Sequence, residues 1–404
     1  MSALRVLHIG KFYPPAPGGM EKVVQLLCES ERAFEHVDSQ VLVANTDART
    51  VREDVHGVPV TRVGALGAVG SVGVCPTFPV EVARVRRDVT VIHEPNPVAL
   101  VADWAARQRG PLVVWFHSEV LRPQWKYRLL YRPFLRRVLA RAARIVVSSP
   151  HLLEYAAELQ PHRHKCVVIP FGLDVERLAA TPEVLAQAAR LRVADPAFRL
   201  LFIGRLVPYK GVDVLLGALT RGTARAWIVG DGPLRGALEA EAAARGLVNQ
   251  VEFLGAVSDE QAAVRFHACD AFVLPSVTPA ETFGVVQLEA MACGKPVIST
   301  NLRSGVPWVN RHGETGLVVE PGSAAALAAA IAQLQADAAL RVRMGEAGRR
   351  RVAQDFSLPT MARRTARIYR EVMAQGTASD TPAVDRTDDM EAASPSAAPT
   401  GGRR

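Results

Sequence analysis

The stretch that decides the fold is residues 271–296, which read AFVLPSVTPAETFGVVQLEAMACGKP. Its first four residues are an apolar run that predicts a buried strand, and a loop with two prolines leads into helical spacing from about Gly284 to Cys293. A strand that turns into a helix start leaves free backbone N–H groups, which together with the helix dipole form an anion site. Glu281 precedes this site, and Glu289 lies about a turn and a half inside the helix. Two acids beside an anion site suit a ligand with a diphosphate and several hydroxyls, such as a nucleotide sugar. The alternative is an ordinary acid at a helix start and a solvated glutamate.

Apolar runs alternate with helical patterns on both sides of this stretch. Strands that alternate with helices predict a mostly parallel sheet covered on both faces. The pattern occurs twice, with a polar, Ala-rich break around residues 174–198, so we expect an α/β protein of two Rossmann-like domains. Ligands of such sheets bind at the carboxyl ends of the strands, which places the site in the cleft between the domains. The expected strands lie at residues 5–9, 40–44, 89–93, 112–116, 145–148 and 167–169, and then at 199–203, 226–229, 251–254, 271–274, 296–299 and 316–319.

Composition agrees with a cytoplasmic protein that handles anionic partners. The 404 residues are enough for two domains. The net charge of +8, with a pI near 9.5, favours phosphorylated ligands, acidic lipid or nucleic acid. Five widely spaced cysteines without a CxxC pair indicate reduced thiols. The N-terminus enters a strand without a signal-peptide pattern, and no apolar stretch approaches the roughly 20 residues that span a bilayer.

Three further motifs follow expected strands and would therefore face the same cleft. Gly18 and Gly19 precede a helix, where glycines let the backbone approach a ligand closely; a tight turn is the alternative. His117 ends an apolar strand, and its alternative is a satisfied interior histidine. Arg205 and Lys210 flank the loop after the first strand of the second half, where they could neutralise a diphosphate; the alternative is a pair of solvated cations.

The chain contains no Asp-x-Asp pair, the motif with which metal-dependent sugar transferases commonly hold a divalent cation. We expect Arg205, Lys210 and helix N–H groups to take the place of the metal, and therefore expect no metal and no cofactor besides the nucleotide-sugar substrate. The glycine-spaced run at residues 64–73 lacks the Gly-Lys-Ser/Thr of a phosphate loop and is predicted to be a flexible loop.

In this order and at these spacings, the motifs resemble those of the retaining glycosyltransferases of family 4, which have the GT-B fold of two Rossmann-like domains. The resemblance covers about residues 3–375. It rests on Gly18-Gly19, the WFHS segment at 115–118, the IPFGLD segment at 169–174, Gly204-Arg205 with Lys210-Gly211, and Glu281 with the EAMACGKP segment that begins at Glu289.

The resemblance implies catalytic roles for His117, Glu281, Arg205 and Lys210. Glu281 would contact hydroxyls of the donor sugar, and His117 would line the sugar pocket near the reacting carbon. The remaining donor contacts would come from Glu289 at the ribose, Gly19 at the diphosphate and acceptor side, the backbone of Phe283, Gly284 and Val285 at the diphosphate, and Val251–Gly255 against the base.

The same resemblance gives an expected domain plan. Residues 1–180 would form an acceptor-binding domain, and residues 181–358 would bind the nucleotide sugar. A helix at 359–375 would cross back to the first domain. Residues 376–404 lack apolar periodicity and are predicted to be a disordered tail.

One segment departs from the family pattern. Many relatives carry Gly-Gly-x-x-Glu where this chain has SGVPW at 304–308, so that Trp308 replaces the acid. Variants of this type resemble transferases of bacterial O-antigen and exopolysaccharide assembly. This favours mannose from GDP-mannose as the donor, and a polyprenyl-diphosphate-linked or saccharide acceptor. The alternatives are a UDP-glucose or UDP-galactose donor, or a nucleotide-sugar hydrolase or epimerase on the same fold.

Residues 122–144 hold eight cations and no acid, with aromatic residues among them. Such a helix suits an anionic membrane surface, which would place the enzyme peripherally at the inner face of the cytoplasmic membrane; a solvated basic face is the alternative. The expected membrane contacts are Arg122, Trp125, Lys126, Arg128, Arg132 and Arg136.

A nucleic-acid binder would explain the charge but not the glutamate pair, so we expect no nucleic acid. A Rossmann oxidoreductase would need Gly-x-Gly-x-x-Gly after the first strand, and the chain lacks it there.

Overall fold

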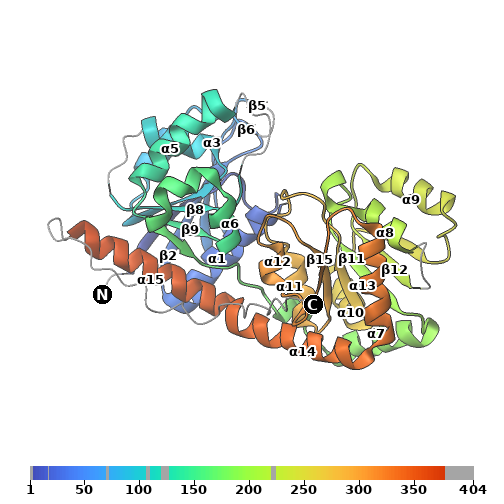
Figure 1. Cartoon of the computed structure of the whole chain (residues 1–404). Coiled ribbons are helices and arrows are strands. Elements are labelled where there is room, and N and C mark those ends of the chain that lie inside the picture. The colour runs from blue at the N-terminus through green and yellow to red at the C-terminus, as the bar shows by residue number, and fades with distance from the viewer. Residues whose placement is uncertain are drawn as a thin grey trace, which may run out of the picture.

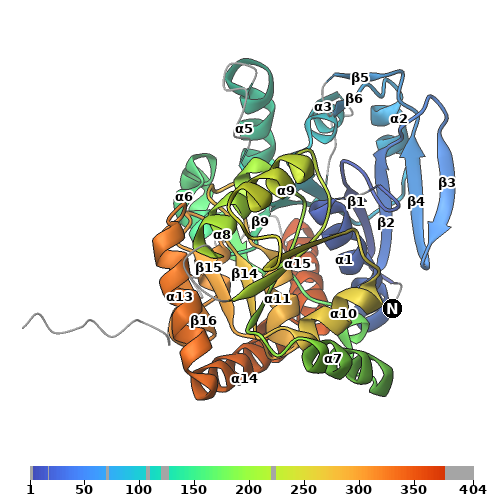
Figure 2. The same cartoon turned by 90° about the vertical axis from the view of Figure 1, so that its right-hand side faces the viewer.

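Two lobes, each built around a largely parallel sheet, make up the protein (Figure 1). The computed structural model describes residues 3–16, 18–69, 72–105, 110–119, 127–219 and 224–377. The two sheets, with helices packed around them (Figure 2), confirm the predicted α/β architecture of two Rossmann-like units.

The N-terminal sheet has eight strands in the order β10-β9-β8-β7-β1-β2-β4-β3, and every neighbouring pair is parallel except β4 with β3. Strands buried on both faces are mostly apolar, as in β8, which reads LVVWF. The strands are β1 Arg5–Ile9, β2 Asp38–Ala44, β3 Val51–Val55, β4 Val58–Val63, β7 Val89–Glu94, β8 Leu112–Phe116, β9 Arg144–Val147 and β10 Cys166–Val168, and a separate hairpin pairs β5 Ala68–Val69 with β6 Val72–Gly73.

The C-terminal sheet has six parallel strands in the order β13-β12-β11-β14-β15-β16. The strand order reverses beside β1 in the first sheet and beside β11 in the second, and ligands of such sheets bind at this point, outside the carboxyl ends of the strands. The strands are β11 Arg199–Ile203, β12 Arg225–Val229, β13 Val251–Gly255, β14 Ala271–Leu274, β15 Val297–Thr300 and β16 Gly316–Val319.

Helices connect most of the strands. A π-helical turn lies at Tyr127–Tyr131, and 3-10 segments lie at Ala157–Lys165, Glu176–Leu178 and Pro208–Lys210. The α-helices are α1 Gly19–Glu35, α2 Phe78–Arg84, α3 Pro97–Ala105, α5 Arg132–Arg141, α6 Pro150–Tyr155, α7 Pro182–Ala194, α8 Val212–Leu219, α9 Arg235–Ala244, α10 Asp259–Ala268, α11 Val285–Ala292, α12 Val306–Val309, α13 Ala324–Ala336, α14 Ala338–Asp355 and α15 Leu358–Thr377.

The chain crosses between the lobes at two places that lie side by side. Leu173 on the first crossing forms a parallel bridge with Ser357 on the second. After the second crossing, α15 runs back along the N-terminal lobe and packs on α1 (Figure 1), where the Tyr369 hydroxyl donates to Glu31 at 2.8 Å. The lobes therefore change near residues 173 and 357, beside the boundaries expected at 180 and 358.

Several elements escaped the sequence pattern, among them β3, β4, α2, α7 and the β5–β6 hairpin. Strand β3 reads VREDV, and nearly all of it is exposed at the edge of the sheet. Its charged side chains protect this edge from pairing with other chains. Helix α7 lies in the Ala-rich stretch that we expected to be a break, and it buries only Val184 and Ala188. The predicted flexible loop at 64–73 contains the short strands β5 and β6. Strand β3, helix α7 and the two-residue strands β5 and β6 bury too few side chains to leave a clear apolar period.

Candidate active site

Arg205 and Lys210 lie on the loop that follows β11, at the carboxyl end of a central strand of the C-terminal sheet. Gly211 allows the close turn, because its φ is +66° and a Cβ there would lie 2.1 Å from the carbonyl oxygen of Pro275. This turn buries Lys210 beside the end of β14. Arg205 remains exposed and forms no ion pair within the described part of the chain.

Glu281 forms an ion pair with Lys210, with 2.5 Å between Oε2 and Nζ, and its carboxylate also accepts a hydrogen bond from the Ser276 hydroxyl at 3.2 Å. Both side chains of the pair are 11% exposed. The structure thus brings together two residues that the sequence presented as separate motifs. Because Glu281 already neutralises Lys210, Arg205 is the cation with more charge to offer an incoming anion.

Helix α11 begins directly beyond the loop after β14. Gly284 precedes the helix with a φ of +69°, and a Cβ there would lie 2.6 Å from Leu274 Cδ2, so only glycine fits this turn. No side chain caps the start of α11. Its first N–H groups, including those of Val285 and Val286, are therefore available to an anion.

Glu289, inside α11, pairs with Arg177 on the short turn Glu176–Leu178. Burial raises the pKa of Glu289, and the neighbouring guanidinium opposes that rise. Arg177 also lies 3.7 Å from Asp259. Sequence reasoning missed Arg177, which comes three residues after the IPFGLD segment in a stretch without periodicity. A ribose that binds Glu289 would share this carboxylate with Arg177.

His117 and Gly19 occupy the facing edge of the N-terminal lobe. His117 follows β8 and is 5% exposed, and its Nε2 lies 3.0 Å from Nδ1 of His93. Burial lowers the pKa of His117 to about 3, so the ring is neutral near pH 7. Its Nδ1 is buried and has no hydrogen-bond partner among the described residues. Gly19 is the exposed first residue of α1, whose start carries no side-chain cap.

Phe171, on the first crossing between the lobes, links the two halves of the site. Its ring centroid lies 5.6 Å from that of His117 and 4.8 Å from that of Phe283, which immediately precedes Gly284. One aromatic wall therefore joins His117 of the N-terminal lobe to the turn before α11 in the C-terminal lobe.

A cavity of about 350 Å³ opens between the lobes beside this wall. Ser118 and Glu119 line it from the N-terminal lobe, and Ala280 and Thr282, the neighbours of Glu281, line it from the other. The cleft expected from the sequence is thus present next to the glutamate and histidine motifs.

Trp308, which replaces an acid of the family pattern, is a packing residue. Its ring centroid lies 6.3 Å from that of Phe283 and 5.7 Å from that of Phe356. Arg351 donates to its carbonyl oxygen at 3.0 Å. In the same segment, the Gly305 N–H donates to the Thr282 carbonyl at 2.7 Å. Through these contacts with Thr282 and Phe283, the segment stabilises the turn before α11.

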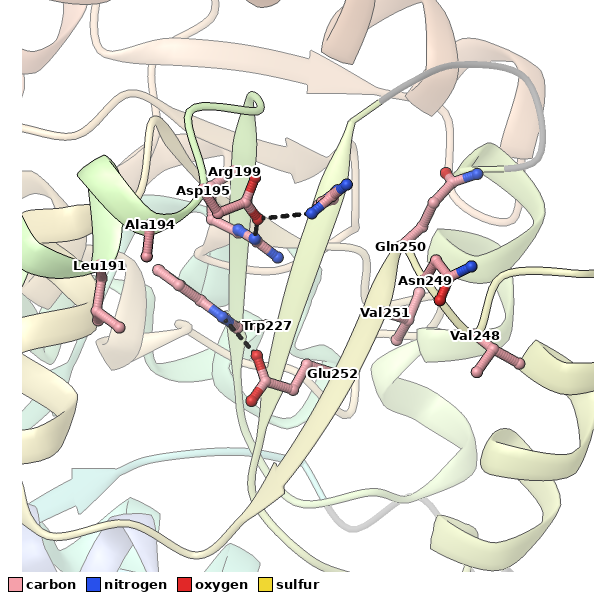
Figure 3. Close-up of a pocket in the computed structure, with 11 residues that line it drawn as sticks. Leu191, Ala194, Asp195, Arg199, Trp227, Val248, Asn249, Gln250, Val251 and Glu252 are labelled. Atoms are coloured by element: carbon pink, nitrogen blue, oxygen red, sulfur yellow. Dashed lines mark hydrogen bonds and ion pairs between the residues drawn. The ribbon is translucent and has the colours of Figure 1, made fainter.

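The structure corrects the expectation that Val251 contacts the nucleotide base. Val251 begins β13 and lines a separate pocket with Arg199, Arg225 and Trp227 (Figure 3). Arg199 and Arg225 are likewise the first residues of their strands. This pocket therefore lies at the amino ends of the strands, opposite the cleft. Only the far end of β13, at Gly255, reaches the cleft edge. The expectation covered the whole of Val251–Gly255, although the amino and carboxyl ends of this strand lie on opposite sides of the sheet.

The basic segment is only partly described. Arg132 and Arg136 lie on α5 and both pair with Glu158, at 2.6 and 3.2 Å, which neutralises part of their charge. Leu129 is 70% exposed, and Trp104 of the adjacent α3 is 52% exposed. Of the expected membrane contacts, Arg122, Trp125, Lys126 and the side chain of Arg128 lie outside the described residues.

Among the helices described, none combines the length and the apolarity needed to cross a bilayer.

Two family descriptions match the chain. "Glycosyl transferase 4-like domain" matches residues 18–172, and "Glycosyl transferases group 1" matches residues 186–351. The unmatched residues between them contain the first crossing at Leu173, so each match corresponds to one lobe.

Characterised relatives match nearly the full length. The D-rhamnosyltransferase WbpZ of Pseudomonas aeruginosa is 34% identical over 361 residues, which are 88% of this chain and 92% of the relative. The O-antigen chain mannosyltransferase C of Escherichia coli is 31% identical over 371 residues, which are 91% of this chain and 98% of the relative.

Solved structures share the arrangement of both lobes. Sucrose-phosphate synthase from Thermosynechococcus elongatus superposes with a TM-score of 0.77 at 23% identity, over 92% of this chain and 100% of the other. Anabaena HepE in complex with UDP gives a TM-score of 0.74 at 22% identity, over 91% and 100%. At these identities the likeness concerns the GT-B fold alone.

Proposed function

Because this chain belongs to the family 4 glycosyltransferases of GT-B fold and is a hexosyltransferase, we propose that it transfers mannose from GDP-mannose to a lipid-linked or oligosaccharide acceptor in cell-surface polysaccharide synthesis. The main support is the grouping of Arg205, the Lys210–Glu281 pair and the uncapped start of α11 at one cleft edge, joined to His117 through Phe171. Such a site offers positive charge to a diphosphate and polar groups to a sugar.

The proposed transfer retains the anomeric configuration. The bond between the anomeric carbon and the leaving phosphate oxygen breaks as negative charge develops on the diphosphate. Arg205, Lys210 and the N–H groups of α11 stabilise that charge, which is the largest catalytic contribution we expect. The acceptor hydroxyl attacks on the same face and forms the new carbon–oxygen bond, and its proton goes to the departing phosphate. Closure of the lobes would exclude water and limit hydrolysis.

The donor is inferred from the names of the relatives. One is an O-antigen chain mannosyltransferase, and the phosphatidyl-myo-inositol mannosyltransferase of Mycobacterium leprae is 31% identical over 389 residues, which are 92% of this chain and 98% of the relative. Another is a D-rhamnosyltransferase, which makes D-rhamnose the second candidate. D-Rhamnose is mannose without its 6-hydroxyl, so a pocket shaped for the mannose configuration suits both sugars.

A transfer assay tests the proposal. The purified full chain is given GDP-mannose, GDP-D-rhamnose, UDP-glucose or UDP-galactose with a polyprenyl-diphosphate-linked saccharide, and the linkage formed is determined by NMR. We expect an α-linked mannosyl product, formed at an unchanged rate in EDTA. Turnover of UDP-sugars alone would contradict the donor. Release of free sugar at the same rate without acceptor would indicate a hydrolase.

A further inference from the structure

Two buried histidines, His93 and His8, connect His117 to helix α1. Nε2 of His117 lies 3.0 Å from Nδ1 of His93, and Nε2 of His93 lies 3.0 Å from Nδ1 of His8. Nε2 of His8 in turn lies 2.9 Å from Oε2 of Glu31. His8, His93 and Glu31 are 0% exposed. The adjacent strands β1 and β7, together with the end of β8, hold the rings in a continuous row that we call the histidine chain: His117, His93, His8 and Glu31.

Glu31 anchors the chain as an acceptor. Besides His8, the Ser39 hydroxyl donates to Oε2 at 2.7 Å and the Tyr369 hydroxyl donates to Oε1 at 2.8 Å. Burial and the nearby carboxylate raise the pKa of Tyr369 well above its ordinary value, so the phenol keeps its proton. Three groups thus surround one carboxylate as donors, and an ionised carboxylate can only accept hydrogen bonds.

The direction of each bond in the chain follows from that anchor. A neutral imidazole has one N–H donor and one bare nitrogen that accepts. Since Glu31 accepts, His8 carries its proton on Nε2 and accepts at Nδ1. His93 then donates from Nε2 and accepts at Nδ1, and His117 donates from Nε2. Burial also lowers the pKa of His93 and of His117, which favours neutral rings. Nδ1 of His117 is left as a bare acceptor, and it is the ring nitrogen without a partner among the described residues.

We propose that His8, His93 and Glu31 are positioning residues that hold His117 in the Nε2–H tautomer, so that its Nδ1 accepts a hydrogen bond from a hydroxyl of the donor sugar. The sugar contact rests on the proposed function, whereas the tautomer does not. Tyr369 lies on α15, which reaches the N-terminal lobe from the second crossing, so this helix helps to fix the anchor of the chain.

The competing arrangement has a proton on both nitrogens of His8. An imidazolium at His8 would donate to His93 as well as to Glu31, which would reverse the later bonds and leave His117 with its proton on Nδ1. Nitrogen-15 NMR of the histidine rings in the ligand-free full chain separates the two cases, because protonated and bare ring nitrogens resonate far apart. We expect three neutral rings, each protonated at Nε2. An Nδ1–H signal on His117 would overturn the proposal.

The Glu31→Gln variant gives a second, functional test. The Tyr369 hydroxyl orients the amide oxygen toward itself, so the amide nitrogen donates to His8 and Ser39 and reverses the histidine chain. We expect His117 to change to the Nδ1–H tautomer. The sugar hydroxyl must then turn to accept from Nδ1 instead of donating to it, and kcat/KM for the sugar donor should fall, by at most about ten-fold, the worth of one hydrogen bond. Discrimination against the monodeoxy donor that lacks the contacted hydroxyl should fall as well. The Tyr369→Phe variant keeps the carboxylate and should keep the wild-type tautomer.

Ser30→Ala is the matched control, because Ser30 is buried on the same helix and donates to the Leu26 carbonyl outside the histidine chain. It should leave both the tautomer and kcat/KM unchanged. A Glu31→Gln protein with the wild-type tautomer would refute the chain, and a changed tautomer with unchanged kinetics would refute the role at the sugar. If Glu31→Gln does not fold, the wild-type spectrum alone decides the tautomer. Absence of turnover with every nucleotide sugar would reject the proposed function and leave the tautomer result standing.

Discussion

The two cations of the donor side differ in what surrounds them. Lys210 is buried and already paired with Glu281, whereas Arg205 is exposed and forms no ion pair with any described residue. Removing Arg205 takes away a charge that no acid among the described residues balances. Removing Lys210 leaves a nearly buried carboxylate without its partner, which is destabilising in itself.

The first prediction separates these two effects. Arg205→Ala should lower kcat/KM by about a hundred-fold, the loss typical of one group that stabilises developing charge, with an unchanged melting temperature. Lys210→Ala should lower both kcat/KM and the melting temperature. The double variant Lys210→Met with Glu281→Gln should recover stability but not activity. Arg311→Ala, which removes an exposed arginine paired with Glu314, serves as the control and should change neither quantity. Near wild-type turnover in Arg205→Ala would refute the assigned role.

Glu94 provides a prediction on pH. This last residue of β7 is fully buried, the Tyr131 hydroxyl donates to it, and its Oε1 has no partner among the described residues. Burial raises its pKa from 4.5 to about 7. Between pH 4.5 and about 7, the folded protein therefore keeps a proton on Glu94 that the unfolded chain has released. The contribution of Glu94 to stability is present below pH 4.5 and is lost as the pH rises to about 7.

Glu94→Gln should remove this dependence. Relative to the wild type, the variant should become more stable at pH 8 than at pH 5, by on the order of 3 kcal/mol for a shift of this size. The measurement is the free energy of urea unfolding of both proteins at the two pH values. A difference between them that stays constant with pH would contradict the raised pKa.

At the scale of elements, two strand–turn–helix units build the donor side, and each depends on a glycine with positive φ. Gly211 closes the β11 loop against Pro275, and Gly284 starts α11 against Leu274. We expect Gly211→Ala to displace Lys210 and to lower both activity and melting temperature. Gly236→Ala, on α9, where an added Cβ meets nothing within 4 Å, should be stabilising by about 1 kcal/mol with full activity. Equal behaviour of the two variants would show that the turn tolerates a side chain.

These local units are what sequence reasoning could find. The run 271–274 and the period of α11 are visible without tertiary information, and so are the glycines and cations after β11. The partners that come from distant segments had no such signal. Arg177 reaches Glu289 across 112 positions, and Tyr369 reaches Glu31 across 338. His8 and His93 each lie inside an apolar strand, where a histidine gives no sign of its neighbours on adjacent strands.

At the scale of the whole molecule, the proposed acceptor implies contact with a membrane, and α5 with its neighbours is the candidate surface. Leu129 and Trp104 are exposed there among basic residues. We expect the protein to cosediment with vesicles rich in anionic lipid, with binding that falls as salt rises, because each cation near such a surface contributes about 1 kcal/mol. Leu129→Ser should weaken binding, whereas Val342→Ser, an exposed apolar change on α14, should not. Equal binding to neutral vesicles would contradict the electrostatic part of this proposal.

The two crossings and α15 join the lobes. They hold the loop of Arg205 and Lys210 in the C-terminal lobe opposite His117 of the N-terminal lobe. The central claim is that a nucleotide sugar binds in this cleft with its diphosphate at the C-terminal lobe. The most direct test is a crystal structure of the full chain with the donor that the transfer assay identifies, in a non-hydrolysable form. The diphosphate should contact the Arg205 guanidinium and the first N–H groups of α11, with the sugar between Glu281 and His117. A donor bound instead in the pocket of Arg199 and Arg225, at the opposite edge of the sheet, with the cleft empty, would contradict the account.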